Sequence, residues 1–192
     1  DVESRGLGDV YKRQGYGVIQ GMAMPIIGFP SCLLSAAAEL MIPTLTEAQM
    51  RSDAAGIRRA VSSLLKLCAA FSVAAALILW RFGGALGEAV YGSAEAGRFI
   101  RLLAPLVPIM YTDMVVDGCL KGLGQQVWSM GINILDAALG VVLVWQLLPI
   151  GALTAYIGII YFNECLNFAL SAARLHRAVK KYAPAPARNA RV

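Results

Sequence analysis

The chain has 192 residues, of which 58% are hydrophobic and only 15% are charged, and its formal net charge is +5. Soluble domains usually carry about 25% charged residues, and a soluble core of this size could not hide so much apolar surface. Long apolar stretches recur along the chain, and each provides the roughly 20 residues that cross a bilayer. The composition therefore predicts an all-α integral membrane protein and excludes an ordinary soluble domain.

The first residues of the chain differ from the rest in composition and rhythm. Residues 1–14, DVESRGLGDVYKRQ, resemble translated adapter read-through at the end of a sequencing contig, so we predict a non-native segment there. The chain begins with Asp1 and shows no signal peptide pattern. We therefore expect a fragment of a longer protein, with a partial transmembrane lobe over 15–178 and a basic, disordered cytoplasmic tail over 179–192.

Five membrane spans are expected, in chain order at 17–42, 57–80, 99–123, 127–148 and 153–176. In the first span, Pro25 and Pro30 should kink the helix, because proline removes a backbone donor. Pro43 is expected to end that helix. Gly17 and Gly21, four residues apart, would allow another helix to pack closely.

The segment 83–97, between the second and third spans, is too short to cross a bilayer. We expect it to lie at the membrane interface. Trp80, Phe82 and Tyr91 would anchor it there, since aromatic side chains collect at headgroup level.

The third span combines a kink with a charged face. Pro105 and Pro108 are expected to bend it. Asp113, Asp117 and Lys121 follow at four-residue steps, which places all three on one helix face. In hydrocarbon an unpaired central charge costs about 2.5–3.5 kcal/mol even on the lenient insertion scale, so these residues need partners.

Charge placement predicts the topology. The chain from residue 174 onward carries six Lys or Arg residues and no acid, and cytoplasmic flanks are enriched in such residues. The C-terminus should therefore be cytoplasmic, with Lys121 and the connector bearing Arg51 on the same side. The arginines of the loop between the second and third spans disagree with this assignment, and Glu88 and Glu95 offset them in part.

Depth in the membrane separates candidate functional residues from structural ones. At 1.5 Å of rise per residue, Asp113 lies about 20 Å from the outer end of its span. Asp136 and Glu164 fall near the middle of theirs. Deep acids usually face a bundle interior or an aqueous cavity, so these three, with the amides Asn133 and Asn167, are the transport-cavity candidates.

The alternative for these groups is structural. Asp117 and Lys121 lie in the last two turns of their span and are expected to form a structural ion pair. The deep acids and amides could likewise join helices through hydrogen bonds, each worth about 0.6–2 kcal/mol.

Other chemistry is not indicated. The cysteines (Cys32, Cys68, Cys119 and Cys165) fall in different apolar stretches without Cys-x-x-Cys spacing, which predicts buried small hydrophobes and no metal site. With one histidine, no phosphate loop and no GxSxG, we expect no enzyme and no cofactor beyond a coupling H⁺ or Na⁺. The basic tail favours anionic membrane lipids over nucleic acid.

Several segments carry a family resemblance that covers residues 15–180. They are GMAMPIIGFPSCLLSAAAELMIPTLTEAQMRSD, YGSAEAGRFIRLLAPLVPIMYTDMVVDGCLKGLGQQ, NILD and YFNECLNF. These segments resemble the stage V sporulation protein B / polysaccharide biosynthesis family, within the multidrug/oligosaccharidyl-lipid/polysaccharide exporter superfamily. The resemblance implies two pseudo-symmetric helical lobes around a cavity, with alternating access by rocking.

The same resemblance implies a function and a location. Family members move lipid-linked oligosaccharide or peptidoglycan precursors across the bacterial cytoplasmic membrane, in cell-wall and sporulation contexts. The five spans would be the second lobe without its first helix, so the N-terminal lobe is a missing partner and the fragment alone should not transport. Two alternatives stay open: a cation-coupled multidrug antiporter of the same superfamily, and a non-transporting membrane scaffold.

Overall fold

The structure is a computed structural model, and it describes residues 14–181, except for the side chains of residues 148–152. All secondary structure in this part of the chain is helical. Four helices are long and apolar enough to cross a membrane, and a bent pair supplies a fifth span. The chain is therefore an all-α, multi-pass membrane protein, as predicted. The segment predicted to be non-native lies, up to residue 13, outside the described residues.

The first span is broken in the middle. A π-helix, η1 (Ile19–Ala23), leads into α2 (Met24–Gly28), and α3 (Ser31–Met50) follows after a bend of 54°. The break falls at Pro30, where the predicted kink was expected. Buried Tyr111 fixes this point from a neighbouring helix, because its hydroxyl donates a 2.5 Å hydrogen bond to the carbonyl of Ile27.

Pro43 does not end the first span, contrary to the prediction. The α3 helix continues through it to Met50. One tertiary contact supports the helix beyond Pro43: the hydroxyl of Thr46 lies 3.0 Å from the carbonyl oxygen of Gly122 in another helix, and 2.9 Å from that of Ile42 within α3 itself. The last turns of α3 are thereby held against the end of another helix.

The second span is longer than predicted. Helix α4 runs over Ala54–Tyr91 and α5 over Ala94–Leu103, so the segment 83–97 forms a helical hairpin. Its position at the membrane interface stays a prediction. At 1.5 Å per residue α4 is about 57 Å long, which exceeds the roughly 30 Å of bilayer hydrocarbon. The turn is built by Gly92, whose φ of 60° is left-handed, and by Ser93, whose hydroxyl accepts from Ala96 N at 3.2 Å.

Close helix packing also differs from the prediction. A Cβ added at Gly17 or Gly21 would meet nothing within 4 Å in the described chain. At Gly87 it would lie 2.2 Å from the backbone nitrogen of Gly97, and at Gly97 it would lie 2.8 Å from Gly84 Cα. Glycines thus allow close contact within the α4–α5 hairpin, and Gly118 of a later helix does the same against Ala38, whose Cβ would lie 2.7 Å from an added methyl group.

The third span follows the predicted kink. A 3₁₀ turn, η2 (Ala104–Leu106), separates α5 from α6 (Val107–Gly122) at the two prolines. Half of the most apolar window of Ala94–Gly122 is buried. Helix α6 is therefore the central element of the described chain.

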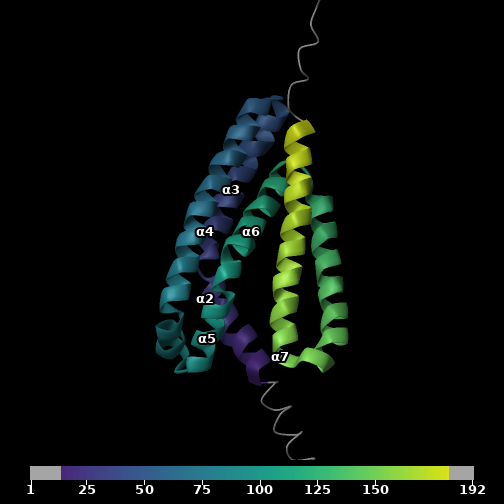
Figure 1. Cartoon of the computed structure of the whole chain (residues 1–192). Helices are drawn as coiled ribbons and strands as arrows, with labels where there is room; N and C mark the ends of the chain where they lie inside the picture. Colours follow the sequence, from purple (N-terminus) through teal and green to yellow (C-terminus); the bar gives the residue numbers. More distant parts are fainter. Residues whose placement is uncertain (1–13, 182–192) are drawn as a thin grey trace, which may run out of the picture.

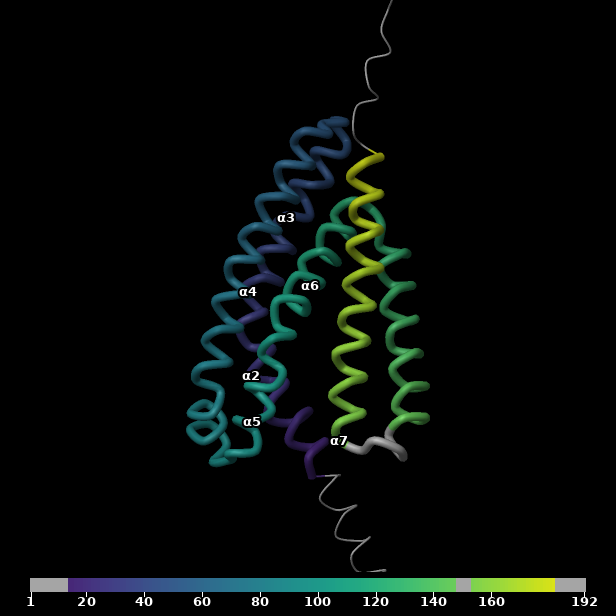
Figure 2. The backbone as a smooth tube through the Cα atoms, in the orientation of Figure 1, coloured from purple at the N-terminus to yellow at the C-terminus, as the bar shows by residue number. Residues whose placement is uncertain are grey.

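The last helix, α7 (Gln126–Lys181), supplies the two remaining spans. Figures 1 and 2 show two antiparallel runs beside α6, and they correspond to the spans Gln126–Leu147 and Leu153–Lys181. We call them the first and second runs of α7. The second run extends to Lys181, so the first residues of the expected tail are helical, and the rest of the tail lies outside the described residues.

Figure 1 also shows which turns share an end of the bundle. The α3–α4 turn, the α6–α7 turn and the C-terminal end of α7 lie together at the upper end, and the α4–α5 turn lies at the opposite one. Arg51, Lys121 and Lys181 therefore lie at the same end of the bundle, as charge placement predicted.

The hairpin glycines generate a stability prediction. Gly97→Ala forces a methyl group against the backbone of α4, and overpacking of this kind costs about 1–3 kcal/mol. We expect this loss in the unfolding free energy of the purified chain in micelles, measured by circular dichroism. Gly17→Ala adds the same methyl group to open space and should be neutral or slightly stabilising. Equal losses in the two variants would contradict the close packing seen at the hairpin.

Candidate functional site

Polar residues recur on one face of each of three neighbouring helical runs. On α6 they are Asp113 and Asp117. On the first run of α7 they are Ser129 and Asp136, seven residues apart. On the second run they are Asn163, Glu164, Asn167, Ser171 and Arg174. We call these nine residues the polar seam.

Asp113 is at the centre of the polar seam. Its Oδ2 accepts a hydrogen bond from Asn167 Nδ2 at 3.1 Å. The buried hydroxyl of Ser171 lies beside the same carboxyl group. Asp136 and Glu164 are close enough to interact with it electrostatically. The structure therefore gathers the three deep acids, predicted on three separate spans, around one side of α6.

Asp117 and Lys121 form the ion pair that their spacing predicted. Lys121 Nζ lies 2.7 Å from Asp117 Oδ2, and the Lys121 side chain is 47% exposed. The other carboxylate oxygen of Asp117 accepts a hydrogen bond from the hydroxyl of Ser129, which is 2% exposed. Asp117 thus has a partner for each oxygen and ties α6 to the first run of α7.

Asp136 opens onto a groove between the two runs of α7. This groove has a volume of about 660 Å³, and Asn163 and Trp145 also line it. Asn133 lies apart from it, on a second groove beside Lys121. Of the five transport candidates, Asp113, Asp136, Glu164 and Asn167 therefore belong to the polar seam, and Asn133 is an exposed neighbour.

Several buried polar atoms in the seam have no hydrogen-bond partner in the described chain. They are Asp113 Oδ1, Asp136 Oδ1, Asn163 Oδ1, Asn167 Oδ1 and Arg174 Nε. Buried polar groups are normally satisfied, and an unsatisfied one needs an explanation such as a bound species. Four of these atoms are acceptors, so the site suits donors such as hydroxyl groups, water or a cation.

Arg174 was interpreted from sequence only as part of the basic flank. In the structure its Nη2 donates to Gln125 Oε1 at 2.5 Å, and its guanidinium lies 4.6 Å from the ring centroid of Trp128. It therefore holds the end of the second run against the α6–α7 turn. Its position seven residues after Asn167, on the same helix face, was the signal that could have found it.

The cysteines follow the prediction only in part. Cys68 and Cys119 are buried, whereas Cys32 and Cys165 are exposed on helix surfaces, where an apolar thiol suits lipid. Within residues 14–181, no group of three or more His, Cys, Asp or Glu side chains is placed to hold a metal ion.

Comparisons with known proteins give two weak relationships. The chain is 26% identical over 121 residues to Sporulation protein YkvU of Bacillus subtilis, and the match covers 59% of this chain and 27% of that protein. It is 24% identical over 118 residues to Stage V sporulation protein B of the same organism, with 62% and 23% covered. No family model and no solved structure matches significantly. The chain thus spans about a quarter of the length of these two relatives.

The Asp113–Asn167 contact generates a prediction. Asn167→Ala removes the donor to a buried carboxylate, and we expect the unfolding free energy in micelles to fall by about 1–2 kcal/mol. Asn133→Ala, on the same helix but exposed, should change it by less than about 0.5 kcal/mol. Denaturation in sodium dodecyl sulfate, followed by circular dichroism, measures both. Similar values for the two variants would show that the seam contact contributes nothing.

Proposed function

We propose that this chain forms most of the second lobe of a flippase that moves lipid-linked oligosaccharide or peptidoglycan precursors by alternating access. The observation that carries the proposal is the set of buried acceptor oxygens in the polar seam that have no partner in the described chain. Such groups are expensive in hydrocarbon and mark pathways in transport proteins.

The chemistry of the substrate explains why these acceptors would be useful. A sugar headgroup carries hydroxyl donors that lose their water when they cross hydrocarbon, at a cost of several kcal/mol for each unpaired group. Acceptors such as Asp113 Oδ1 and Asn167 Oδ1 would replace that water. The same oxygens could bind a coupling H⁺ or Na⁺, and neither role requires the residues of the polar seam to rearrange.

The relatives support the proposal at a coarse level. Both bear names of sporulation proteins, and each is much longer than this chain. A two-lobe transporter would account for the difference, with the missing N-terminal lobe completing the cavity. In this proposal the protein lies in the cytoplasmic membrane, the C-terminus is cytoplasmic, and the basic tail contacts anionic lipids.

A cation-coupled small-molecule antiporter is the second candidate. Clustered acids in a low-dielectric site are also what a coupling cation requires, and the proximity of Glu164 to Asp113 and Asp136 favours this role. The two candidates differ in what crosses the membrane, so one transport assay separates them.

The assay uses the complete protein, including the upstream reading frame, reconstituted in vesicles with a fluorescent lipid-linked saccharide. We expect transfer between leaflets, and we expect Asp113→Asn to slow it at least about tenfold, since loss of one charged hydrogen bond in a protein site costs about 1.4 kcal/mol or more. Glu88→Gln, which neutralises an exposed acid of α4, should leave the rate unchanged.

Absence of transfer for any lipid-linked precursor would contradict the flippase proposal. If the same vesicles instead expel small cationic compounds in response to a H⁺ or Na⁺ gradient, the antiporter replaces it. If neither activity is found and Asp113→Asn is without effect, the polar seam is structural and the scaffold alternative holds.

A further inference from the structure

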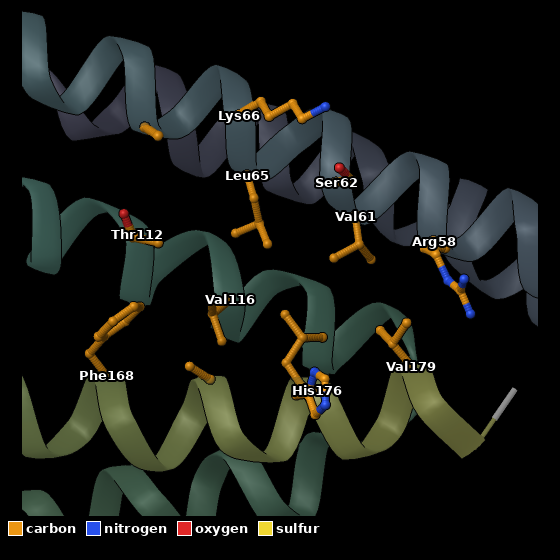
Figure 3. Close-up of a pocket in the computed structure, with 13 residues that line it drawn as sticks. Arg58, Val61, Ser62, Leu65, Lys66, Thr112, Val116, Phe168, His176 and Val179 are labelled. Carbon is orange, nitrogen blue, oxygen red and sulfur yellow. The ribbon is translucent and has the colours of Figure 1, made fainter. Parts of the chain in front are cut away.

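A third groove, away from the polar seam, lies between α4, α6 and the second run of α7. Its volume is about 450 Å³, which is within the usual range for ligand sites. Figure 3 shows its apolar walls: Val61 and Leu65 point in from α4, Val116 from α6, and Phe168 from α7.

Every charged or titratable side chain that lines this groove is basic. They are Arg58, Lys66 and His176. No hydrogen bond or ion pair joins any of them to another described residue, and all three are exposed. In Figure 3 the Lys66 side chain runs along α4 toward the end of the groove that holds Arg58, as a long cationic side chain does when it reaches toward headgroups.

The groove has a direction relative to the bilayer. Arg58 lies in the second turn of α4 and His176 lies near the last turns of α7, at the upper end of the bundle in Figure 1. From Arg58 to Ala69 the groove covers about 16 Å along α4 at 1.5 Å per residue. This length is close to one leaflet of hydrocarbon, about 15 Å. The groove is therefore basic at headgroup depth and apolar below it.

We propose that this groove is a binding site for one anionic phospholipid from the leaflet at that end of the bundle. The phosphate group lies against Arg58 and His176 with Lys66 beside it, and an acyl chain lies along Val61 and Leu65. Charge complementarity selects the headgroup. The apolar walls exclude a free anion as the occupant, because it would leave them uncovered.

The groove and the polar seam have opposite chemistry. The unpartnered atoms of the seam are mostly acceptors, which attract donors and cations. The groove presents cationic donors, which attract a phosphate. The lipid site requires only that the chain lies in a bilayer, so it does not depend on the proposed transport activity.

Native mass spectrometry of the 192-residue chain in detergent tests the proposal. The probes are phosphatidylglycerol and phosphatidylcholine with identical acyl chains. We expect phosphatidylglycerol to bind more tightly. Arg58→Gln and Lys66→Gln should each weaken its binding about fivefold, since a basic residue near anionic lipid contributes about that factor. Their effect on phosphatidylcholine should be small.

Arg59→Gln is the matched control. Arg59 is the next residue after Arg58 and carries the same charge, but its side chain does not line the groove. It should bind phosphatidylglycerol as the unchanged chain does. Ala172→Leu, which adds bulk within the groove while keeping every charge, should weaken both lipids, and circular dichroism checks that it folds.

Three outcomes would overturn the proposal. Equal binding of the two lipids would show that the groove does not recognise an anionic headgroup. Equal losses in Arg58→Gln and Arg59→Gln would show attraction to net charge alone. Competition by glycerol phosphate as strong as that by phosphatidylglycerol would show an anion site without a lipid chain.

Discussion

The structure depends on a single constraint: polar side chains on α6 and α7 lie inside apolar spans and must find partners within the protein. Helix α6 meets this constraint from both sides. Tyr111 satisfies a carbonyl at the bend of the first span, and Asp113 and Asp117 bind the two runs of α7 through Asn167 and Ser129. The runs of α7 bury only 11% and 6% of their apolar windows. These polar contacts, with those of Arg174, therefore add to the apolar packing that holds the second run against the core.

The same constraint divides the molecule by function. The core formed by η1 to α6 is closed by small residues, and the α4–α5 hairpin shows this most clearly, where glycine backbones touch. The α7 hairpin instead leaves acceptor atoms without partners and grooves beside them. A closely packed part thus supports a part whose polar side chains include acceptors without partners in the described chain. Arg51, Lys121 and Lys181 lie at one end of the bundle, where an anionic leaflet would meet them.

Sequence patterns predicted the fold class, the five spans and the end of the bundle at which each turn lies. They did so because the membrane determines where apolar stretches and flanking charges fall along the sequence. They also predicted the Asp117–Lys121 pair, which is local. They failed where tertiary packing overrides a local signal: Pro43 stays helical because Thr46 and α6 support it, and α4 runs on to Tyr91 because α5 packs against it. Depth in the membrane predicted the grouping of Asp113 with Asp136 and Glu164, but not the hydrogen bond from Asn167. Arg174 was missed because its partners, Gln125 and Trp128, lie far from it in the sequence, at the α6–α7 turn and the start of α7.

The central claim is that the polar seam is open to water or substrate rather than sealed against lipid. Thiol accessibility in proteoliposomes tests it, in a chain whose exposed Cys32 and Cys165 are replaced by Ala. Asn163→Cys places a thiol at the groove of Asp136, and Phe162→Cys places one on the adjacent exposed apolar surface. We predict that a charged, membrane-impermeant thiol reagent modifies Asn163→Cys and leaves Phe162→Cys unmodified. Equal reactivity at the two positions, or no reaction at Asn163→Cys, would contradict it.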